Sequence, residues 1–190
     1  MDSYDSGSDA RFVYENSGPL RDKDPAGSVV YCFRNPKAPV YAARDEGRTV
    51  DFQVIETEVL RISSLFRPVI IEAAGGVLVP VTEDMLVADM IGPLGGTPVI
   101  AARAGLGTIN HTLLTIEALD RRGIKPAGVV FIDAGEQATP PDMIRENRLA
   151  VESISGVKVA GVVGRISDFS RPPGESYQPI IRIWERLAGC

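Results

Sequence analysis

The 190 residues carry a formal net charge of −5, and 44% of them are hydrophobic. Because the chain has no basic cluster, it lacks the Lys/Arg surface that nucleic-acid phosphates require, and we exclude nucleic acid as a partner. Glycine, proline or charge interrupts every long apolar run, so no segment approaches the about 20 residues of a membrane-spanning helix. We expect one globular domain over residues 1–190 and, because the N-terminus has no signal-like apolar region, a cytoplasmic location.

Two helices are predicted in the first third of the chain. Residues 9–16 have short helical character, with Asp9 at the start, where the helix dipole favours an acid. A longer helix is predicted from Asp51, which stands near its N-cap. The apolar positions of that helix recur at steps of three and four: Phe52, Ile55, Val59, Ile62 and Phe66.

Residues 69–76 are predicted to form a strand that stops at two glycines. Their run, Val-Ile-Ile-Glu-Ala-Ala-Gly-Gly, places the carboxylate of Glu72 at the end of an otherwise apolar segment. Gly75 can adopt a positive φ in the turn that follows. A strand-end acid in a nucleotide-using α/β fold typically meets Mg²⁺, which prefers anionic oxygen and retains waters. An acid that caps a nearby helix is the alternative.

A second glycine-rich turn occupies residues 103–112. We predict a strand over 98–103, a turn at the glycines and a helix over 109–122 with Thr108 as its N-cap. The free backbone amides at the helix start, those of Gly107, Thr108, Ile109 and Asn110, are expected to point outward together and to bind a carboxylate or phosphate. A turn without a ligand is the alternative, since any strand-to-helix connection can use glycines.

The remaining elements alternate between helix and strand. We expect an extended segment over 77–81, a helix over 82–90 and a linker over 92–96. Further strands are predicted over 127–132 and 157–163, with a helix over 140–153 whose residues 145–148 are exposed. A last helix containing Trp184 is expected to cover the sheet. Apolar strands that alternate with helices predict an α/β fold with a mostly parallel sheet and helices on both faces.

Taken in order, these motifs resemble those of dethiobiotin synthetase, an ATP-dependent ligase with a P-loop NTPase-like fold. The matching runs are residues 8–10, 35–39, 72–80, 88–89 and 105–111. The resemblance extends over about residues 8–164, and residues 165–190 would then form a C-terminal covering helix.

The resemblance implies a reaction and a set of site residues. The reaction converts 7,8-diaminononanoate (diaminopelargonate), CO₂ and ATP to dethiobiotin, ADP and phosphate in biotin biosynthesis. Asp9 and Glu72 would share one Mg²⁺, and Asp133 stands near the position from which the family reads the base of ATP. A homodimer is implied, in which the helix start of one subunit binds the substrate carboxylate of the other. The substrate-binding residues implied are Gly75, Gly105, Gly107, Thr108, Ile109 and Asn110.

The chain also departs from the family pattern. No Gly-x-x-x-x-Gly-Lys-[Ser/Thr] run occurs in the 190 residues, although the family's ATP site depends on a close variant of that loop. We therefore expect an N-terminally incomplete, P-loop-less fragment of an active enzyme, and we assign no catalytic residue. A non-catalytic binding or dimerisation paralogue that has lost ATP binding is the alternative. A cobyrinate amidation enzyme is a weaker third possibility, because the chain has no room for its glutaminase domain.

Overall fold

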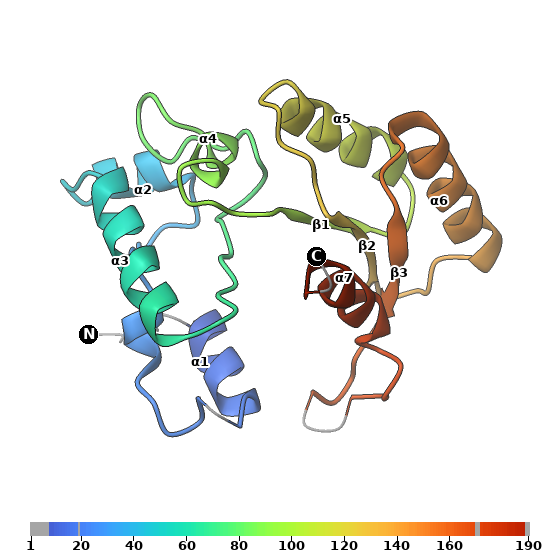
Figure 1. Ribbon diagram of the computed structural model, residues 1–190, viewed down its shortest axis with the longest axis horizontal. Coiled ribbons are helices and arrows are strands. Elements are labelled where there is room, and N and C mark those ends of the chain that lie inside the picture. Colours follow the sequence, from blue (N-terminus) through green and yellow to red (C-terminus); the bar gives the residue numbers. More distant parts are fainter. Residues whose placement is uncertain (1–7, 19, 170–171, 189–190) are drawn as a thin grey trace. The chain divides into compact units, whose positions relative to one another are not determined.

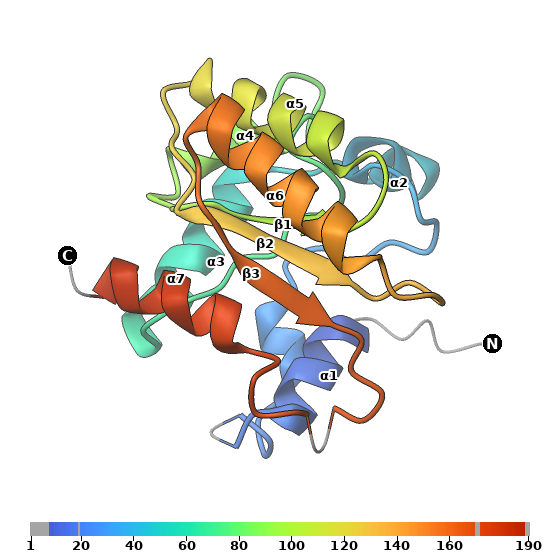
Figure 2. The ribbon, with the colours of Figure 1, turned by 90° about the vertical axis from the view of Figure 1, so that its right-hand side faces the viewer.

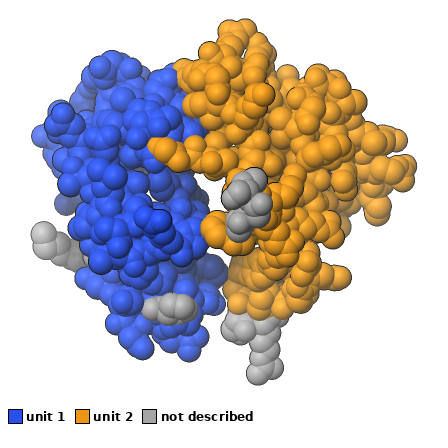
Figure 3. All heavy atoms as spheres, in the orientation of Figure 1, with its two compact units in different colours: residues 1–94 blue, residues 95–190 orange. Residues whose placement is uncertain are grey.

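The computed structural model describes residues 8–18, 20–169 and 172–188. The chain divides into two compact units between Leu94 and Gly95 (Figure 3). The single domain expected over residues 1–190 stays a prediction, and the two units are described in turn. In the described part of the chain, no helix has the length and apolar character needed to cross a membrane.

The first unit is helical. Its elements are α1 (Ser8–Asn16), the 3-10 helix η1 (Pro25–Ser28), α2 (Pro39–Asp45), α3 (Phe52–Leu65) and α4 (Val87–Ile91) (Figure 1). A small core joins α3 to α4 and to the turn before α4, and its buried members are Ile55, Val81, Val87 and Met90. The helices predicted near residues 9–16 and from residue 51 are both present.

The N-cap predicted for α3 is confirmed. The Asp51 carboxylate accepts a hydrogen bond of 2.8 Å from the Gln53 backbone N–H, which satisfies one of the donors that a helix start leaves without an intrahelical partner. Ile55, one turn into the helix, is buried.

Replacing Asp51 with alanine is expected to destabilise α3 by about 1 kcal/mol, because the cap acceptor is lost. Asp51→Asn is the matched control, since asparagine keeps a side-chain oxygen at the same position. Amide hydrogen exchange in the first turn of α3 provides the measurement. Faster exchange in the asparagine variant than in the alanine variant would contradict the assignment of the cap.

Residues 69–76 do not form the predicted strand. They follow α3 as irregular, largely exposed backbone, and Ile70 is 88% exposed. An apolar run becomes a strand only where a neighbouring strand bonds to its backbone, and the described residues of the first unit include no strand element. The strand predicted to end at Glu72 is therefore wrong, and the extended segment predicted over 77–81 is largely a turn.

The helix predicted over residues 82–90 is also shorter than expected, because α4 begins only at Val87. Residues 80–86 fold back on themselves instead. Within this turn the Val81 N–H donates to the Met85 carbonyl oxygen at 2.8 Å. A backbone closed in this way cannot also make the bonds of a helical turn.

The second unit contains a three-stranded parallel sheet in the order β1-β2-β3. Its strands are β1 (Val99–Arg103), β2 (Gly128–Asp133) and β3 (Val159–Gly164), and its helices are α5 (Thr108–Asp120), α6 (Pro141–Ser155) and α7 (Gln178–Ala188). Helices α5 and α6 lie on one face of the sheet, and α7 lies on the other (Figure 2). The predicted α/β fold, with a parallel sheet and helices on both faces, is thus confirmed in this unit.

The central strand β2 carries the core of this unit. Val129 and Phe131 are fully buried. Val130 packs in a cluster with Ile183 of α7. Because successive side chains of a strand point to opposite faces, β2 contributes apolar side chains to both layers of helices.

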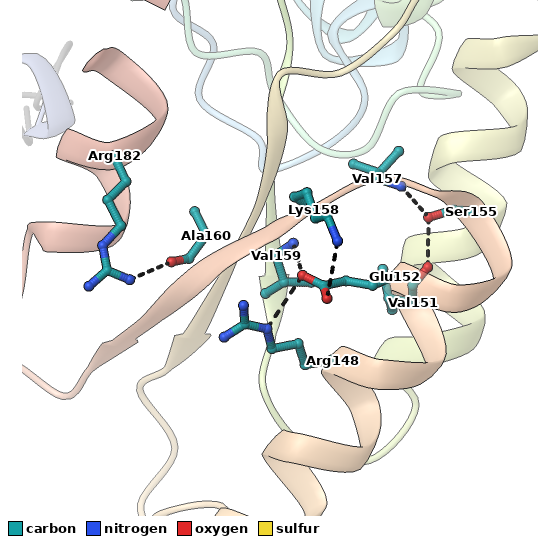
Figure 4. Close-up of polar contacts among 9 residues, drawn as sticks. All are labelled: Arg148, Val151, Glu152, Ser155, Val157, Lys158, Val159, Ala160 and Arg182. Carbon is teal, nitrogen blue, oxygen red and sulfur yellow. Dashed lines mark hydrogen bonds and ion pairs between the residues drawn. The ribbon is translucent and has the colours of Figure 1, made fainter. Parts of the chain in front are cut away.

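Side chains of α6 and α7 bond to the backbone of the edge strand β3 (Figure 4). The Glu152 carboxylate accepts a hydrogen bond of 2.9 Å from the Val159 N–H. An Arg182 guanidinium N–H donates to the Ala160 carbonyl oxygen at 3.3 Å. These contacts occupy backbone groups that an edge strand otherwise offers to another chain.

Glu152 is held in its charged form at this edge. Its side chain is 16% exposed, and it lies 3.4 Å from Arg148 and 3.9 Å from Lys158. Burial raises the pKa of Glu152, but the Val159 amide and the two cations outweigh burial, so the pKa lies below its usual value of 4.5.

Candidate functional site

The candidate site lies where the strands of the second unit end. In a parallel sheet all carboxyl ends share one edge, and ligands of open α/β folds bind there. Strand β1 ends at Arg103 and β2 at Asp133. Residues 104–107 then turn from β1 into α5, and we call them the glycine turn.

The two glycines of the glycine turn, Gly105 and Gly107, are favoured at their positions for different physical reasons. Gly107 has φ +88°, a left-handed conformation that side chains with a Cβ rarely adopt. Gly105 is favoured by space, because a Cβ there would make a tight contact of 3.3 Å with the Thr139 hydroxyl oxygen. The turn predicted at these two residues is therefore present.

The start of α5 differs in detail from the prediction. Gly107, not Thr108, is the N-cap residue, and no side chain caps the helix. The Thr108 N–H donates to the Gly105 carbonyl oxygen at 3.3 Å, so the expectation of a free Thr108 amide is wrong. The Thr108 hydroxyl is buried and lies 3.3 Å from that of Thr112. Thr108 therefore closes the turn with its backbone N–H, while its side chain faces inward.

The next amides of α5 remain available for a ligand. The His111 N–H makes the first intrahelical bond, 3.2 Å from the Gly107 carbonyl oxygen. The amides of Ile109 and Asn110 precede that bond and have no intrahelical acceptor. Asn110 is exposed and Ile109 is half-buried. The helix start thus presents N–H groups and the positive end of the α5 dipole at the sheet edge.

Asp133, the residue predicted to bind the nucleotide, has an intrachain contact. Its carboxylate accepts hydrogen bonds from the Thr139 hydroxyl at 2.7 Å and from the Thr139 N–H at 3.1 Å. These bonds close the loop between β2 and α6. A role of Asp133 toward a nucleotide stays a prediction.

Asn147 of α6 is a site residue that the sequence reasoning missed. Residues 145–148 were expected to be exposed, but Asn147 is buried, with 8% of its surface accessible. Its side-chain N–H donates to the Ala104 carbonyl oxygen at 2.8 Å and reaches that of Gly105 at 3.4 Å. One feature of the sequence could have predicted this burial: Asn147 shares a helix face with Val151, which lies four residues further along.

The predicted metal ligands belong to the first unit. Asp9 lies in the first turn of α1, and Glu72 lies in the irregular segment; both are exposed. Among the described residues, no group of three or more His, Cys, Asp or Glu side chains is placed to hold a metal. Two carboxylates fit Mg²⁺, which keeps several waters and takes one or two protein carboxylates. That they share one ion stays a prediction.

Gly75, the remaining candidate for substrate binding, is also in the first unit. Its φ is +84°, and a Cβ there would lie 2.9 Å from a Val79 methyl carbon, so this position requires glycine. The structure therefore brings together Gly105, Gly107 and the α5 start at one sheet edge. The other candidates, Asp9, Glu72 and Gly75, lie in the first unit.

The parallel sheet, its two layers of helices and the glycine turn at its carboxyl edge are consistent with a P-loop NTPase-like α/β fold. A family model described as an AAA domain matches residues 13–173, and the chain belongs to that family.

Curated relatives confirm the resemblance to dethiobiotin synthetase. Three proteins named ATP-dependent dethiobiotin synthetase BioD illustrate it. The protein of Anaeromyxobacter dehalogenans (strain 2CP-C) is 41% identical over 134 residues, which are 70% of this chain and 59% of the relative. Those of Bacillus licheniformis and Bacillus subtilis (strain 168) are 36% and 33% identical over 80% and 74% of this chain, and over 63% and 60% of their own lengths. The chain thus spans less than two thirds of each of these relatives.

Proposed function

We propose that this protein acts in an ATP-dependent, dethiobiotin synthetase-like ligase reaction that converts 7,8-diaminononanoate and CO₂ to dethiobiotin. The observation that carries the proposal is the similarity to proteins of that name over 70–80% of the chain. The site geometry supports it, because the α5 start presents backbone N–H groups, which suit the carboxylate of such a substrate.

In this proposal the start of α5, which the glycine turn positions, binds the substrate. The amides of Ile109 and Asn110 would donate to the carboxylate of 7,8-diaminononanoate, and the α5 dipole would favour its negative charge. Charge-assisted hydrogen bonds of this kind fix the orientation of the ligand as well as its affinity. The aliphatic part of the acid would then carry the two amines away from the helix start.

ATP would supply the phosphoryl group that activates the reaction. The 190 residues include no Gly-x-x-x-x-Gly-Lys-[Ser/Thr] run, so we assign no phosphate-binding step to them. The start of α5 therefore accounts for binding of the substrate carboxylate and not for binding of the ATP phosphates.

The test is an ATP- and CO₂-dependent assay of dethiobiotin formation. It is run on the 190-residue chain and on any in-frame extension that its gene encodes upstream. Product formation by either form supports the ligase. If neither form makes dethiobiotin and neither binds 7,8-diaminononanoate, the ligase proposal fails and a non-catalytic module is the better description.

We also propose that Asp9 and Glu72 bind one Mg²⁺, since both acids lie in runs that match the family. Glu72→Gln is expected to weaken Mg²⁺ binding on the order of tenfold or more, because even outer-shell partners of a metal contribute that much. Titration calorimetry measures the affinity. Glu15→Gln, which changes another exposed acid of the first unit, is the control. Equal Mg²⁺ affinity in wild type and Glu72→Gln would remove the assignment.

A homodimer and a cytoplasmic location complete the proposal. The dimer would let the α5 start of one subunit meet the substrate of the other. Sedimentation velocity tests it, with a species of about twice the 20.4 kDa chain mass as the expected result. A monomer at assay concentrations would confine the site to one chain.

A further inference from the structure

We infer that Asn147 is the positioning residue of the glycine turn, acting from α6 on the backbone between β1 and α5. Its consequence for substrate binding rests on the proposed function, but its structural role does not. Helix α6 lies beside α5 on the same face of the sheet (Figure 2), which brings this side chain to the turn.

The first observation concerns the backbone carbonyl oxygen of Ala104, which lies just past the end of β1 and needs a hydrogen-bond donor from outside the sheet. The Ala104 N–H still donates to the Ile132 carbonyl oxygen of β2 at 3.1 Å, but β1 ends at Arg103. Ala104 is only 1% exposed, so its carbonyl oxygen is shielded from bulk water. Asn147 supplies the donor at 2.8 Å. A buried carbonyl without a donor is costly, and Asn147 removes that cost.

The second observation is a support that approaches the turn from the loop between β2 and α6. Thr139 is held by two hydrogen bonds to the Asp133 carboxylate. Its hydroxyl oxygen would lie 3.3 Å from a Cβ at Gly105, so it packs closely against that glycine. Asn147 also reaches the Gly105 carbonyl oxygen at 3.4 Å. Asn147 and Thr139 therefore approach Gly105 from two separate elements.

The same support bears on ligand binding. The Gly105 carbonyl oxygen accepts from the Thr108 N–H, and that bond closes the turn into α5. Asn147, by fixing the peptides of residues 104 and 105, therefore also fixes the direction of the amides that begin α5. A site whose donors are already oriented loses less entropy when a carboxylate binds. The ligand class is an aliphatic carboxylate, as the proposed function requires.

The test compares Asn147→Leu with Val151→Ala. Leucine has a similar volume but no donor. Val151 lies one turn further along α6 and is fully buried, so its truncation disturbs the helix without removing a bond to the turn. Hydrogen exchange of residues 104–110 and the affinity for 7,8-diaminononanoate are measured in both variants. Asn147→Ser, which replaces the amide donor with a hydroxyl donor, is the conservative variant. It takes the place of Asn147→Leu in the comparison if the leucine variant does not fold.

In Asn147→Leu we expect faster exchange over residues 104–110 and an affinity about three- to tenfold weaker, the effect of one lost hydrogen bond. In the enzyme assay this change should raise KM and leave kcat nearly unchanged. Serine should restore part of the protection, and Val151→Ala should not change exchange in the turn selectively. Wild-type exchange over 104–110 in Asn147→Leu would overturn the inference. If wild type itself does not bind the acid, the proposed function fails, while the exchange result still decides the role of Asn147.

Discussion

Under the proposed function, replacing Gly107 with valine is expected to lower kcat/KM for 7,8-diaminononanoate on the order of 100-fold. Gly107 has φ +88°, and a β-branched residue held in this conformation carries about 1–3 kcal/mol of strain. The nearest side-chain atom to an added Cβ is the His111 Cε1 at 3.9 Å, so conformation rather than space is the obstacle. The turn would relax and displace the amides of α5, and a displacement of about 1 Å at a binding site can cost 10²-fold in rate.

Gly123→Val is the matched control for that experiment. Gly123 follows the other end of α5, has φ +69° and has no neighbouring atom within 4 Å of an added Cβ. The two substitutions therefore impose similar backbone strain on the same helix. Unfolding should show similar destabilisation, whereas only Gly107→Val should lose activity. Equal losses of activity would show that the stability of α5, and not the shape of the turn, limits the reaction.

Replacing Glu152 with alanine is expected to destabilise the second unit by about 1–3 kcal/mol, the cost of leaving a buried donor without its acceptor. The Val159 N–H loses its partner, and Arg148 and Lys158 lose the charge that they flank. The chain has a single tryptophan, Trp184, which lies in α7 of this unit. Its fluorescence during urea unfolding reports the change.

The control for this substitution is Glu117→Ala. Glu117 pairs with Arg121 on the surface of α5, and its side chain is 55% exposed. Such i,i+4 pairs contribute about 0.3–0.5 kcal/mol at most. Equal, small effects of the two substitutions would contradict the role assigned to Glu152.

The lowered pKa of Glu152 adds a pH dependence with a definite sign. In the unfolded chain the carboxylate binds a proton near its usual pKa of 4.5, and in the folded chain it does so only at lower pH. Its contribution to stability is therefore fully present above the unfolded pKa and is lost as the pH falls through the folded pKa. Glu152→Gln, which keeps an acceptor but not the charge, should flatten the loss of stability between neutral and acidic pH. An unchanged slope would contradict the assignment.

Local patterns in the sequence were sufficient to predict most helices and strands of the second unit. The apolar run over 127–132 predicted β2, and the helical spacing after residue 108 predicted α5, in each case within two residues of the observed bounds. In α3 the Asp51 cap was also predicted. These signals succeeded because strand runs, helical spacing and caps depend on neighbours within about one turn of chain.

Local patterns failed where an element needs a distant partner. Residues 69–73 have the composition of a buried strand, yet they are irregular, since no strand of the described first unit pairs with them. Residues 82–86 have helical composition, yet hydrogen bonds to Met85 close a turn there. Composition indicates what a segment can form, and pairing decides whether it does.

The sequence by itself determined the fold class, the glycine turn and the resemblance to dethiobiotin synthetase. Only the tertiary structure decided how that turn is held. Asn147 lies 43 residues from Ala104, and nothing in the spacing of α6 identifies the carbonyl oxygen that it bonds. Likewise, the sequence shows Glu152 only as one more charged residue of a surface helix. Its contact with β3 is seen only in the tertiary structure. Which buried polar groups meet depends on how helices pack on the sheet, and that packing arises from contacts far apart in the chain.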